Sequence, residues 1–128
     1  MAVIGLGVDL VDVEEAERLL ERWGDRLLRR LLTDAERAYV LRFDRPAQYL
    51  AVRLAAKEAV YKALQGLPGA REVRWRHIEV VRRHDGVPSI RLHDEAARLS
   101  AAAGAVRISL SLSHTKRTAG AVALIERD

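Results

Sequence analysis

The hydrophobic pattern begins with a short strand signal over residues 3–11. Ile4, Leu6, Val8 and Leu10 fall on one face of such a strand, and Gly5, Gly7 and Asp9 fall on the other. Glycines inside a strand weaken it, and they often mark the close approach of a ligand or of another backbone. We therefore expect the glycine face to leave space beside the carboxylate of Asp9.

Helical spacing replaces this alternation after the strand. Asp12 is a typical N-cap residue, and the apolar positions that follow it predict a helix that pauses at Gly24 and then resumes. Thr33 and Glu36 have the spacing of a capping box and predict a second helix that ends near Phe43.

A third helix is predicted over residues 46–65, because proline favours a helix start and the glycine-containing segment 66–69 ends it. Its central stretch is rich in alanine, which suggests close neighbours, yet it carries Lys57, Glu58 and Lys62. Charged side chains are costly where neighbours are close. Either these three are ordinary solvated charges, or the helix presents them to a ligand.

The second half of the chain predicts strands. The Asp-Gly pair at 85–86 is typical of a hairpin turn between two short strands. A short helix is expected from a cap at Asp94 to Gly104. Residues 106–114 then alternate clearly, and the chain returns through residues 119–126 to close a second hairpin.

The strand at 106–114 assigns its side chains to two faces. Val106, Ile108, Leu110 and Leu112 are expected inward, with His114 next in the same register, and Ser109, Ser111 and Ser113 outward. The complete pattern predicts one α+β domain over residues 1–128, with an N-terminal strand and helices followed by a mostly antiparallel sheet.

Composition narrows the class of protein. With 49% apolar and 31% charged residues, the chain has the make-up of a soluble globular protein. The absence of cysteine excludes a disulfide framework and a thiolate metal site, and it fits a reducing compartment. The first 17 residues carry no basic leader, and Asp9 and Asp12 interrupt their apolar run. We therefore expect neither a signal peptide nor a membrane span in this segment, and we expect the protein to be cytoplasmic.

The charge balance favours anionic partners. The formal net charge is +4, from 22 basic and 18 acidic side chains, which suits nucleic acid, nucleotides or an acidic protein. Aromatic residues make up only 5%, too few for base-stacking surfaces of the kind that bind single strands. The sequence has no glycine-rich phosphate loop of the Walker type, which excludes a P-loop nucleotidase.

Two carboxylates stand out as candidate metal ligands. Asp9 on a strand and Glu58 on a helix suit Mg²⁺, which takes one or two protein carboxylates and completes its shell with water and phosphates. Lys62 and His114 nearby would suit a pyrophosphate. Ordinary alternatives exist for each: Glu58 and Lys62 have the i, i+4 spacing of a surface ion pair worth about 0.2–0.5 kcal/mol, and His114 suits a core histidine.

Six segments resemble the holo-[acyl-carrier-protein] synthases, the short 4'-phosphopantetheinyl transferases of fatty-acid synthesis, in both order and spacing. They are GLGVDLVDV (5–13), RLLTDAE (30–36), RLAAKEAVYKAL (53–64), WRHIEV (75–80), DGVPSI (85–90) and SLSHTKRTAGAVALIE (111–126). The resemblance extends over essentially the whole chain.

The resemblance implies a reaction and a set of site residues. The 4'-phosphopantetheine group of coenzyme A would be transferred to a serine hydroxyl of apo acyl carrier protein, releasing adenosine 3',5'-bisphosphate. By this resemblance Asp9 and Glu58 hold Mg²⁺, and Lys62 acts with them in catalysis. The coenzyme A site is implied to include Lys62, His114, Arg53, Lys57, Ser113 and Thr115. Lys57 lies about 100° around the helix from Glu58, so the two side chains need not share one environment. The resemblance also implies a homotrimer with active sites between protomers.

Three positions depart from the family pattern. Glu15 stands where a basic residue often contacts the acidic carrier protein, so that Arg18 or the cluster Arg22, Arg26, Arg29 and Arg30 would have to replace it. Gln65 replaces a glycine near the nucleotide, and His77 replaces a common acidic residue.

Two other classes of function fit the residues considered alone. A basic binding module would bind RNA or an acidic protein without needing magnesium, with a steep salt dependence for nucleic acid. A metal-dependent phosphohydrolase would act on coenzyme A or a nucleotide without a protein acceptor.

Overall fold

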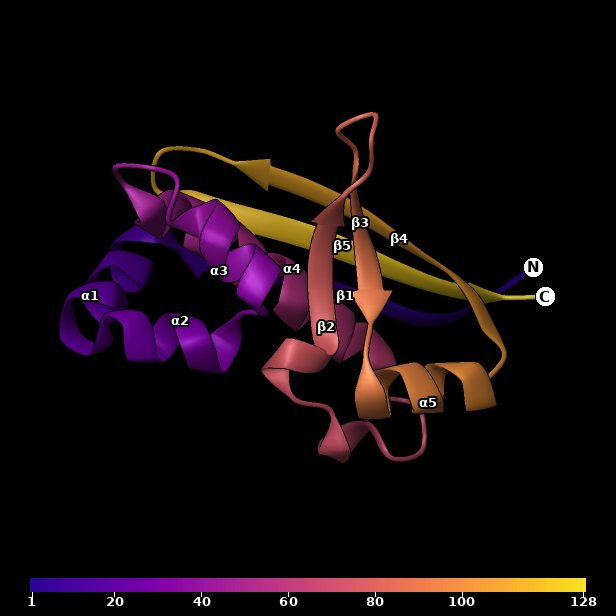
Figure 1. The fold of residues 1–128 in the computed structure, drawn as a ribbon. Helices are drawn as coiled ribbons and strands as arrows, with labels where there is room; N and C mark the ends of the chain where they lie inside the picture. The colour runs from indigo at the N-terminus through magenta and orange to yellow at the C-terminus, as the bar shows by residue number, and fades with distance from the viewer.

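Three antiparallel strands form the main sheet, in the order β1–β5–β4. These are β1 (Ala2–Asp12), β4 (Ala105–His114) and β5 (Thr118–Arg127). The computed structural model describes residues 1–128, apart from the side chain of Val106. The sheet joins the first strand of the chain to the last, and both termini lie at the same end of the molecule (Figure 1).

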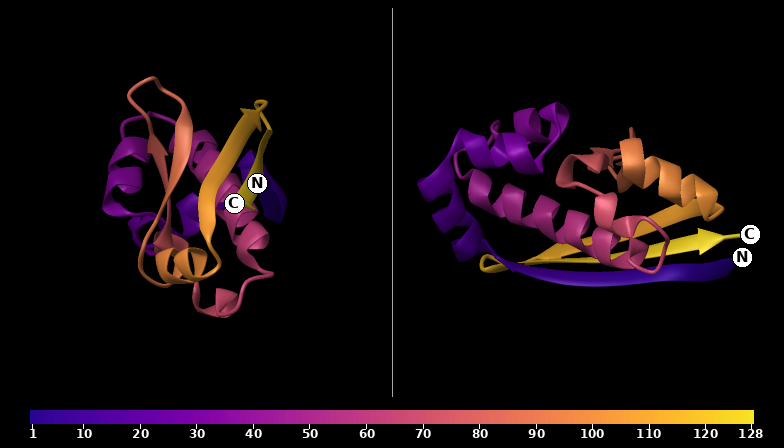
Figure 2. Two further views of the ribbon diagram at one scale, coloured as in Figure 1. Left: turned by 90° about the vertical axis from the view of Figure 1, so that its right-hand side faces the viewer. Right: turned by 90° about the horizontal axis from the view of Figure 1, so that it is seen from below.

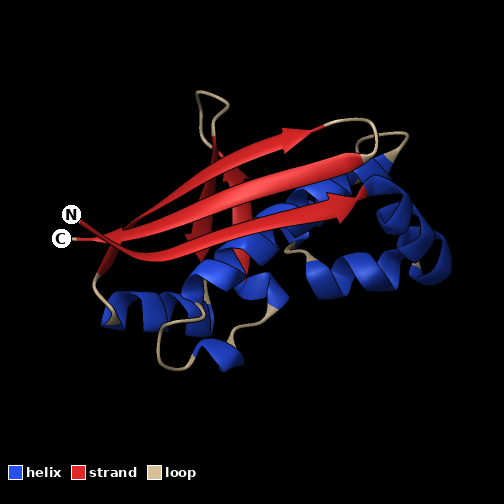
Figure 3. Cartoon of the chain, turned by 180° about the vertical axis from the view of Figure 1, so that it is seen from behind, coloured by secondary structure: helices blue, strands red, loops and turns tan.

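The longest helix, α4 (Pro46–Leu64), packs on one face of this sheet (Figure 3). The remaining elements surround α4: α1 (Val13–Trp23), α2 (Asp25–Leu31), α3 (Asp34–Val40), the hairpin β2 (Ile78–Arg82) and β3 (Pro88–Leu92), and α5 (Asp94–Ala102). Two 3₁₀ turns, η1 (Ala70–Glu72) and η2 (Trp75–His77), connect α4 to β2. Figure 2 shows α4 between the sheet and these outer elements. The α+β prediction is confirmed.

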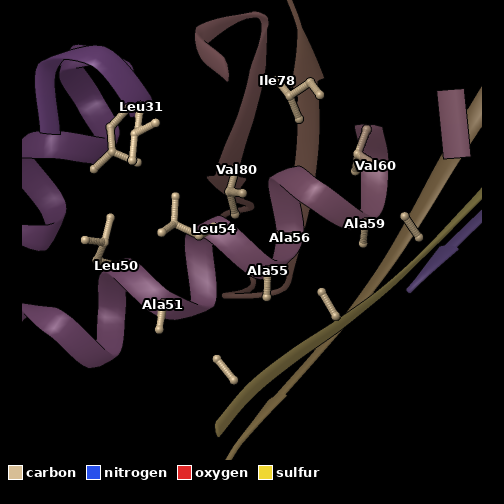
Figure 4. Close-up of a cluster of buried hydrophobic side chains, with 14 of the residues drawn as sticks. Leu31, Leu50, Ala51, Leu54, Ala55, Ala56, Ala59, Val60, Ile78 and Val80 are labelled. Atoms are coloured by element: carbon tan, nitrogen blue, oxygen red, sulfur yellow. The ribbon is translucent and has the colours of Figure 1, made fainter. Parts of the chain in front are cut away.

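The alanines of α4 explain its close packing. Ala51, Ala55 and Ala59 point toward the strands of the sheet, as Figure 4 shows. Leu54 points toward the opposite side, where Val80 of the hairpin lies. All five residues are buried, and the small side chains allow the helix backbone to lie close to the sheet.

Local sequence signals placed most helix ends correctly. The Thr33 hydroxyl accepts a hydrogen bond from the Glu36 amide while the Glu36 side chain accepts one from the Thr33 amide, which completes the predicted capping box. Asp12 caps α1 by accepting from the Glu14 amide. The prediction of Asp94 as a cap is wrong, because Asp94 is the first residue of α5 and His93 is at the N-cap position.

The two edge strands, β1 and β4, differ in whether their apolar face is buried against the core or exposed. On β4, Ile108, Leu110 and Leu112 pack against the core as predicted, while the expectation for Val106 concerns a side chain outside the described part. On β1 the glycine face packs against the helix, and the apolar face is exposed: Leu6 is 66%, Val8 59% and Leu10 73% exposed.

In the part of the chain that the structure describes, no helix has both the length and the apolar character needed to cross a bilayer.

Candidate active site

Asp9 lies on the face of β1 that packs against α4, and two glycines on this face allow the helix to come very close. A Cβ atom added at Gly7 would lie 1.8 Å from the carbonyl oxygen of Ala59. One added at Gly5 would lie 2.0 Å from the carbonyl oxygen of Ala63. The glycines therefore accommodate another backbone, one of the two uses that their position predicts. As a result, the Asp9 carboxylate lies beside α4.

Lys62 and Glu58, one turn apart on α4, meet Asp9 there. The Lys62 ammonium donates hydrogen bonds to Asp9 Oδ1 at 2.9 Å and to the Val8 carbonyl at 3.1 Å. Lys62 therefore pairs with a residue 53 positions away, in addition to any attraction that the i, i+4 spacing predicts with Glu58. The structure brings the three predicted catalytic residues together.

The electrostatics of this group reflect two carboxylates close to one cation. Burial raises the pKa of Glu58, and the negative charge of Asp9 raises it further, while Lys62 acts in the opposite direction. The hydrogen bond to Asp9 raises the pKa of Lys62, so its ammonium stays charged at neutral pH. A second cation beside Asp9 and Glu58 would relieve the repulsion between the carboxylates.

The donor set is suited to a hard cation that keeps part of its own shell. Among the side chains that the structure describes, no group of three or more His, Asp or Glu residues comes together as a complete metal site. Mg²⁺ is commonly bound through only one or two carboxylates, with water and substrate phosphates as the other ligands. Asp9 and Glu58 therefore fit a cation that arrives with its phosphate substrate.

Lys57 lies in the interior, unlike Lys62. Its side chain is fully buried, and its ammonium lies 2.6 Å from Glu36 Oε1 and donates to the Trp75 carbonyl at 3.0 Å. Burial lowers the pKa of Lys57, and the charge and hydrogen bond of Glu36 act against that effect. The Lys57 ammonium therefore has two partners within the chain, which gives it a structural role, and its contact with coenzyme A stays a prediction.

Arg53 is also directed inward. Its guanidinium carbon lies 4.1 Å from the centre of the Tyr39 ring, and Tyr39 packs edge-on against Phe43 and Tyr49. Burial lowers the pKa of Arg53, and its Nε has no hydrogen-bond partner among the described atoms. Arg53 therefore packs against aromatic side chains in this structure, and its place in the coenzyme A site stays a prediction.

His114 lies at the opposite edge of the sheet from Asp9. His114 pairs with Ala119 of β5, and Asp9 pairs with Ala121 from the other side, so the strand β5 separates them. Two strand spacings amount to about 10 Å. The His114 ring is exposed, with Nδ1 2.8 Å from Gln48 Nε2, so the alternative of a core histidine is wrong.

Ser113 and Thr115 flank His114 where β4 turns into β5. Both are exposed. The Thr115 hydroxyl accepts hydrogen bonds from the amides of Arg117 at 3.2 Å and Thr118 at 3.1 Å, so it shapes the turn. One chain therefore presents two separate groups of predicted site residues: Asp9, Glu58 and Lys62 at one edge, and Ser113, His114 and Thr115 at the other.

A hollow of about 1060 Å³ opens beside Glu58, between α2, α4 and the turns that precede β2. Its walls include Arg30, Tyr61, Arg74, Trp75, Arg76 and His77. Apart from Arg30 and His77, these residues carry no sequence signal that predicts a site role. They lie on a helix face or in short turns where periodicity carries little information.

Comparison with known proteins gives consistent matches over nearly the whole chain. Residues 5–120 match the model of the 4'-phosphopantetheinyl transferase superfamily. The chain is 44% identical over 120 residues to a holo-[acyl-carrier-protein] synthase of Moorella thermoacetica, covering 94% of this chain and 91% of that protein.

Solved structures match as well. A crystal structure of holo-[acyl-carrier-protein] synthase from Neisseria meningitidis superposes with a TM-score of 0.88 at 31% identity, covering 98% of this chain and 100% of that one. The Helicobacter pylori holo-[acyl-carrier-protein] synthase in complex with coenzyme A has a TM-score of 0.79 at 28% identity, with 94% and 99% covered.

Proposed function

This chain belongs to the holo-[acyl-carrier-protein] synthases of the 4'-phosphopantetheinyl transferase superfamily, and we propose that it transfers phosphopantetheine from coenzyme A to apo acyl carrier protein. The carrier's serine oxygen attacks the phosphorus that bears the pantetheine arm. A new P–O bond forms, the pyrophosphate P–O bond breaks, and adenosine 3',5'-bisphosphate leaves. The serine proton passes to a base that this sequence does not identify.

The observation that carries the proposal is the meeting of Asp9, Glu58 and Lys62, of which Glu58 also lines the hollow. Asp9 and Glu58 would hold Mg²⁺. When bound, the ion would neutralise charge on the pyrophosphate and orient it. Lys62, held by Asp9 and the Val8 carbonyl, would contact the phosphates as charge builds on the leaving group.

Two copies of the chain would complete the coenzyme A site. Ser113, His114 and Thr115 lie one sheet width from Asp9 in the same chain, so we assign them to the active site of a neighbouring protomer. The exposed apolar face of β1, with Leu6, Val8 and Leu10, supports such an assembly, because large exposed apolar patches commonly mark interfaces. The proposed assembly is a homotrimer.

The proposed setting is fatty-acid biosynthesis in the cytoplasm, with the acidic carrier protein and coenzyme A as partners and without nucleic acid or membrane as a ligand. Family membership supports these assignments, and the basic balance of the chain, +4 at neutral pH, suits an acidic protein partner. The absence of cysteine is compatible with a reducing compartment.

The intact mass of an apo acyl carrier protein, after incubation with this protein, coenzyme A and Mg²⁺, tests the reaction. We expect a gain of one phosphopantetheine mass, which EDTA suppresses and which Asp9→Ala or Glu58→Ala abolishes while the fold persists. Transfer at normal rates in both variants would refute the assignment of the metal ligands. Omitting the carrier serves as a control: release of adenosine 3',5'-bisphosphate without acceptor would instead indicate a phosphohydrolase.

A further inference from the structure

A series of hydrogen bonds leads from the buried pair of Lys57 and Glu36 to the wall of the hollow. The Glu36 carboxylate accepts from the Thr33 amide at 2.9 Å, and the Thr33 hydroxyl donates to Glu79 Oε2 at 2.7 Å. The other oxygen of Glu79, Oε1, lies 2.9 Å from His93 Nε2. We call these five residues the polar network. All of its members except Glu36 line the hollow of the candidate active site.

Glu79 is the carboxylate in the middle of the polar network. It is buried, and among the described side chains its ion pairs include only His93. Burial raises the pKa of Glu79, but the hydrogen bonds with Thr33 and His93 outweigh that effect and lower the pKa, so the carboxylate is ionised at neutral pH. An ionised carboxylate only accepts hydrogen bonds. His93 Nε2 therefore carries a hydrogen and donates it to Glu79.

The backbone around His93 also fixes the direction of its side chain. The His93 amide donates to the His77 carbonyl at 2.7 Å, and this junction between β3 and α5 lies beside the turn η2 (Figure 1). The next residue, Asp94, has φ of 49°, which residues other than glycine adopt only at a cost. Such strain persists where the surrounding structure imposes it, and it is concentrated at functional sites. The imidazole is therefore held toward Glu79 from two sides.

We propose that His93 is a positioning residue for the transfer reaction, acting through Glu79 and Thr33 on the wall of the hollow. The proposal rests on the proposed function and adds a residue to the same site. Lys57 and Glu58 are neighbours on α4, so the network that fixes Lys57 also fixes the helical turn that carries Glu58. Without His93, the buried Glu79 carboxylate would lose one of its two hydrogen bonds and would move toward water. Thr33, which is bound to Glu79, would shift with it.

The variants His93→Gln and His93→Asn distinguish positioning from simple loss of stability. The Nε2 amide of glutamine extends about as far from the backbone as the histidine Nε2, so it can still donate to Glu79. The shorter asparagine amide extends only as far as Nδ1 and cannot. Ile125→Val is the stability control, because it removes a methyl group from a buried residue of β5 that does not line the hollow.

The assays are carrier modification, which gives kcat and a separate KM for carrier and for coenzyme A, and thermal unfolding. We expect His93→Asn to lower kcat about tenfold, the lower end of the effect that outer hydrogen-bonding partners have at metal sites, with each KM within about threefold of wild type. His93→Gln should restore kcat to near the wild-type value. Ile125→Val should lower Tm and leave kcat unchanged.

A double-variant comparison tests whether His93 acts through Glu79. If it does, adding His93→Asn to Glu79→Gln should lower kcat by no more than about twofold beyond Glu79→Gln alone, because residues of one network are not additive. A further tenfold loss would overturn the proposal. So would a wild-type kcat in His93→Asn, an equal loss in His93→Gln, or a fall in kcat that follows Tm in Ile125→Val.

Failure of the proposed function is a different result, because wild-type protein would then leave the carrier unmodified before any variant is compared. The stabilities of the same single and double variants, measured in urea, would still decide whether His93 acts through Glu79. Additive losses of stability would contradict that link.

Discussion

Gly7→Ala is the substitution that most directly tests how the fold builds the site. The new methyl carbon would lie 1.8 Å from the Ala59 carbonyl oxygen and 2.8 Å from its carbonyl carbon. An ordinary contact begins near 3.4 Å, so β1 and α4 would have to separate locally by about 1.6 Å. The obstructing atoms belong to the helix backbone, and no change of side-chain rotamer can relieve the clash.

Both stability and activity should fall. Overpacking typically costs about 1–3 kcal/mol, and we expect about 3 kcal/mol here because the obstacle is backbone, which lowers Tm by roughly 10 °C. The same separation would lengthen the 2.9 Å contact between Lys62 and Asp9 beyond hydrogen-bonding distance. Misplacement of about 1 Å can reduce a rate about 100-fold, so transfer should fall by that order at temperatures where the variant is folded.

Thermal unfolding by circular dichroism and the initial rate of carrier modification, both at equal protein concentrations, measure these effects. Gly66→Ala is the matched control: no atom lies within 4 Å of the added carbon, and its backbone lies outside the left-handed region. It should leave Tm unchanged or raise it slightly. A Gly7→Ala protein with wild-type Tm and wild-type rate would refute the close approach of β1 and α4.

Three further predictions concern other parts of the molecule. Lys57→Met should lower the free energy of unfolding, measured in urea, by about 3–5 kcal/mol, because it leaves the buried Glu36 carboxylate without its cation. The double variant Lys57→Met/Glu36→Gln should recover part of this loss. Equal free energies of unfolding for wild type and Lys57→Met would refute a buried ion pair. Because the pKa of Glu58 is raised on folding, mainly by burial, its stabilising contribution is present at low pH and lost as pH rises through the folded-state pKa. In EDTA at pH 8, Glu58→Gln should therefore melt at or above wild type, yet bind Mn²⁺ more weakly by calorimetry; a clear loss of Tm would contradict this. Val8→Asp should dissociate the proposed trimer, as measured by sedimentation velocity, whereas Val87→Asp on the exposed hairpin should leave it intact. If the Val8→Asp assembly kept the wild-type mass, the interface would have to lie elsewhere.

The sequence by itself determined the features that depend on neighbouring residues. The capping box of Thr33 and Glu36, the hairpin turn at Asp85, and the two faces of β4 each follow from a pattern within ten residues. The α+β class follows from the order of these elements. The motifs also identified the family and, through it, singled out Asp9, Glu58 and Lys62.

Only the tertiary structure decided which of two lysines on one helix can reach a ligand at the protein surface. Lys57 and Lys62 have similar surroundings in the sequence, but Glu36 of α3 binds the first inside the core, and Asp9 of β1 binds the second at the surface. Tertiary contacts also placed His114 at the far edge of the sheet and exposed Leu6 and Val8 on β1. A short-range sequence pattern shows which face of a helix or strand is apolar. Which other element covers that face depends on packing between segments that are distant in the sequence.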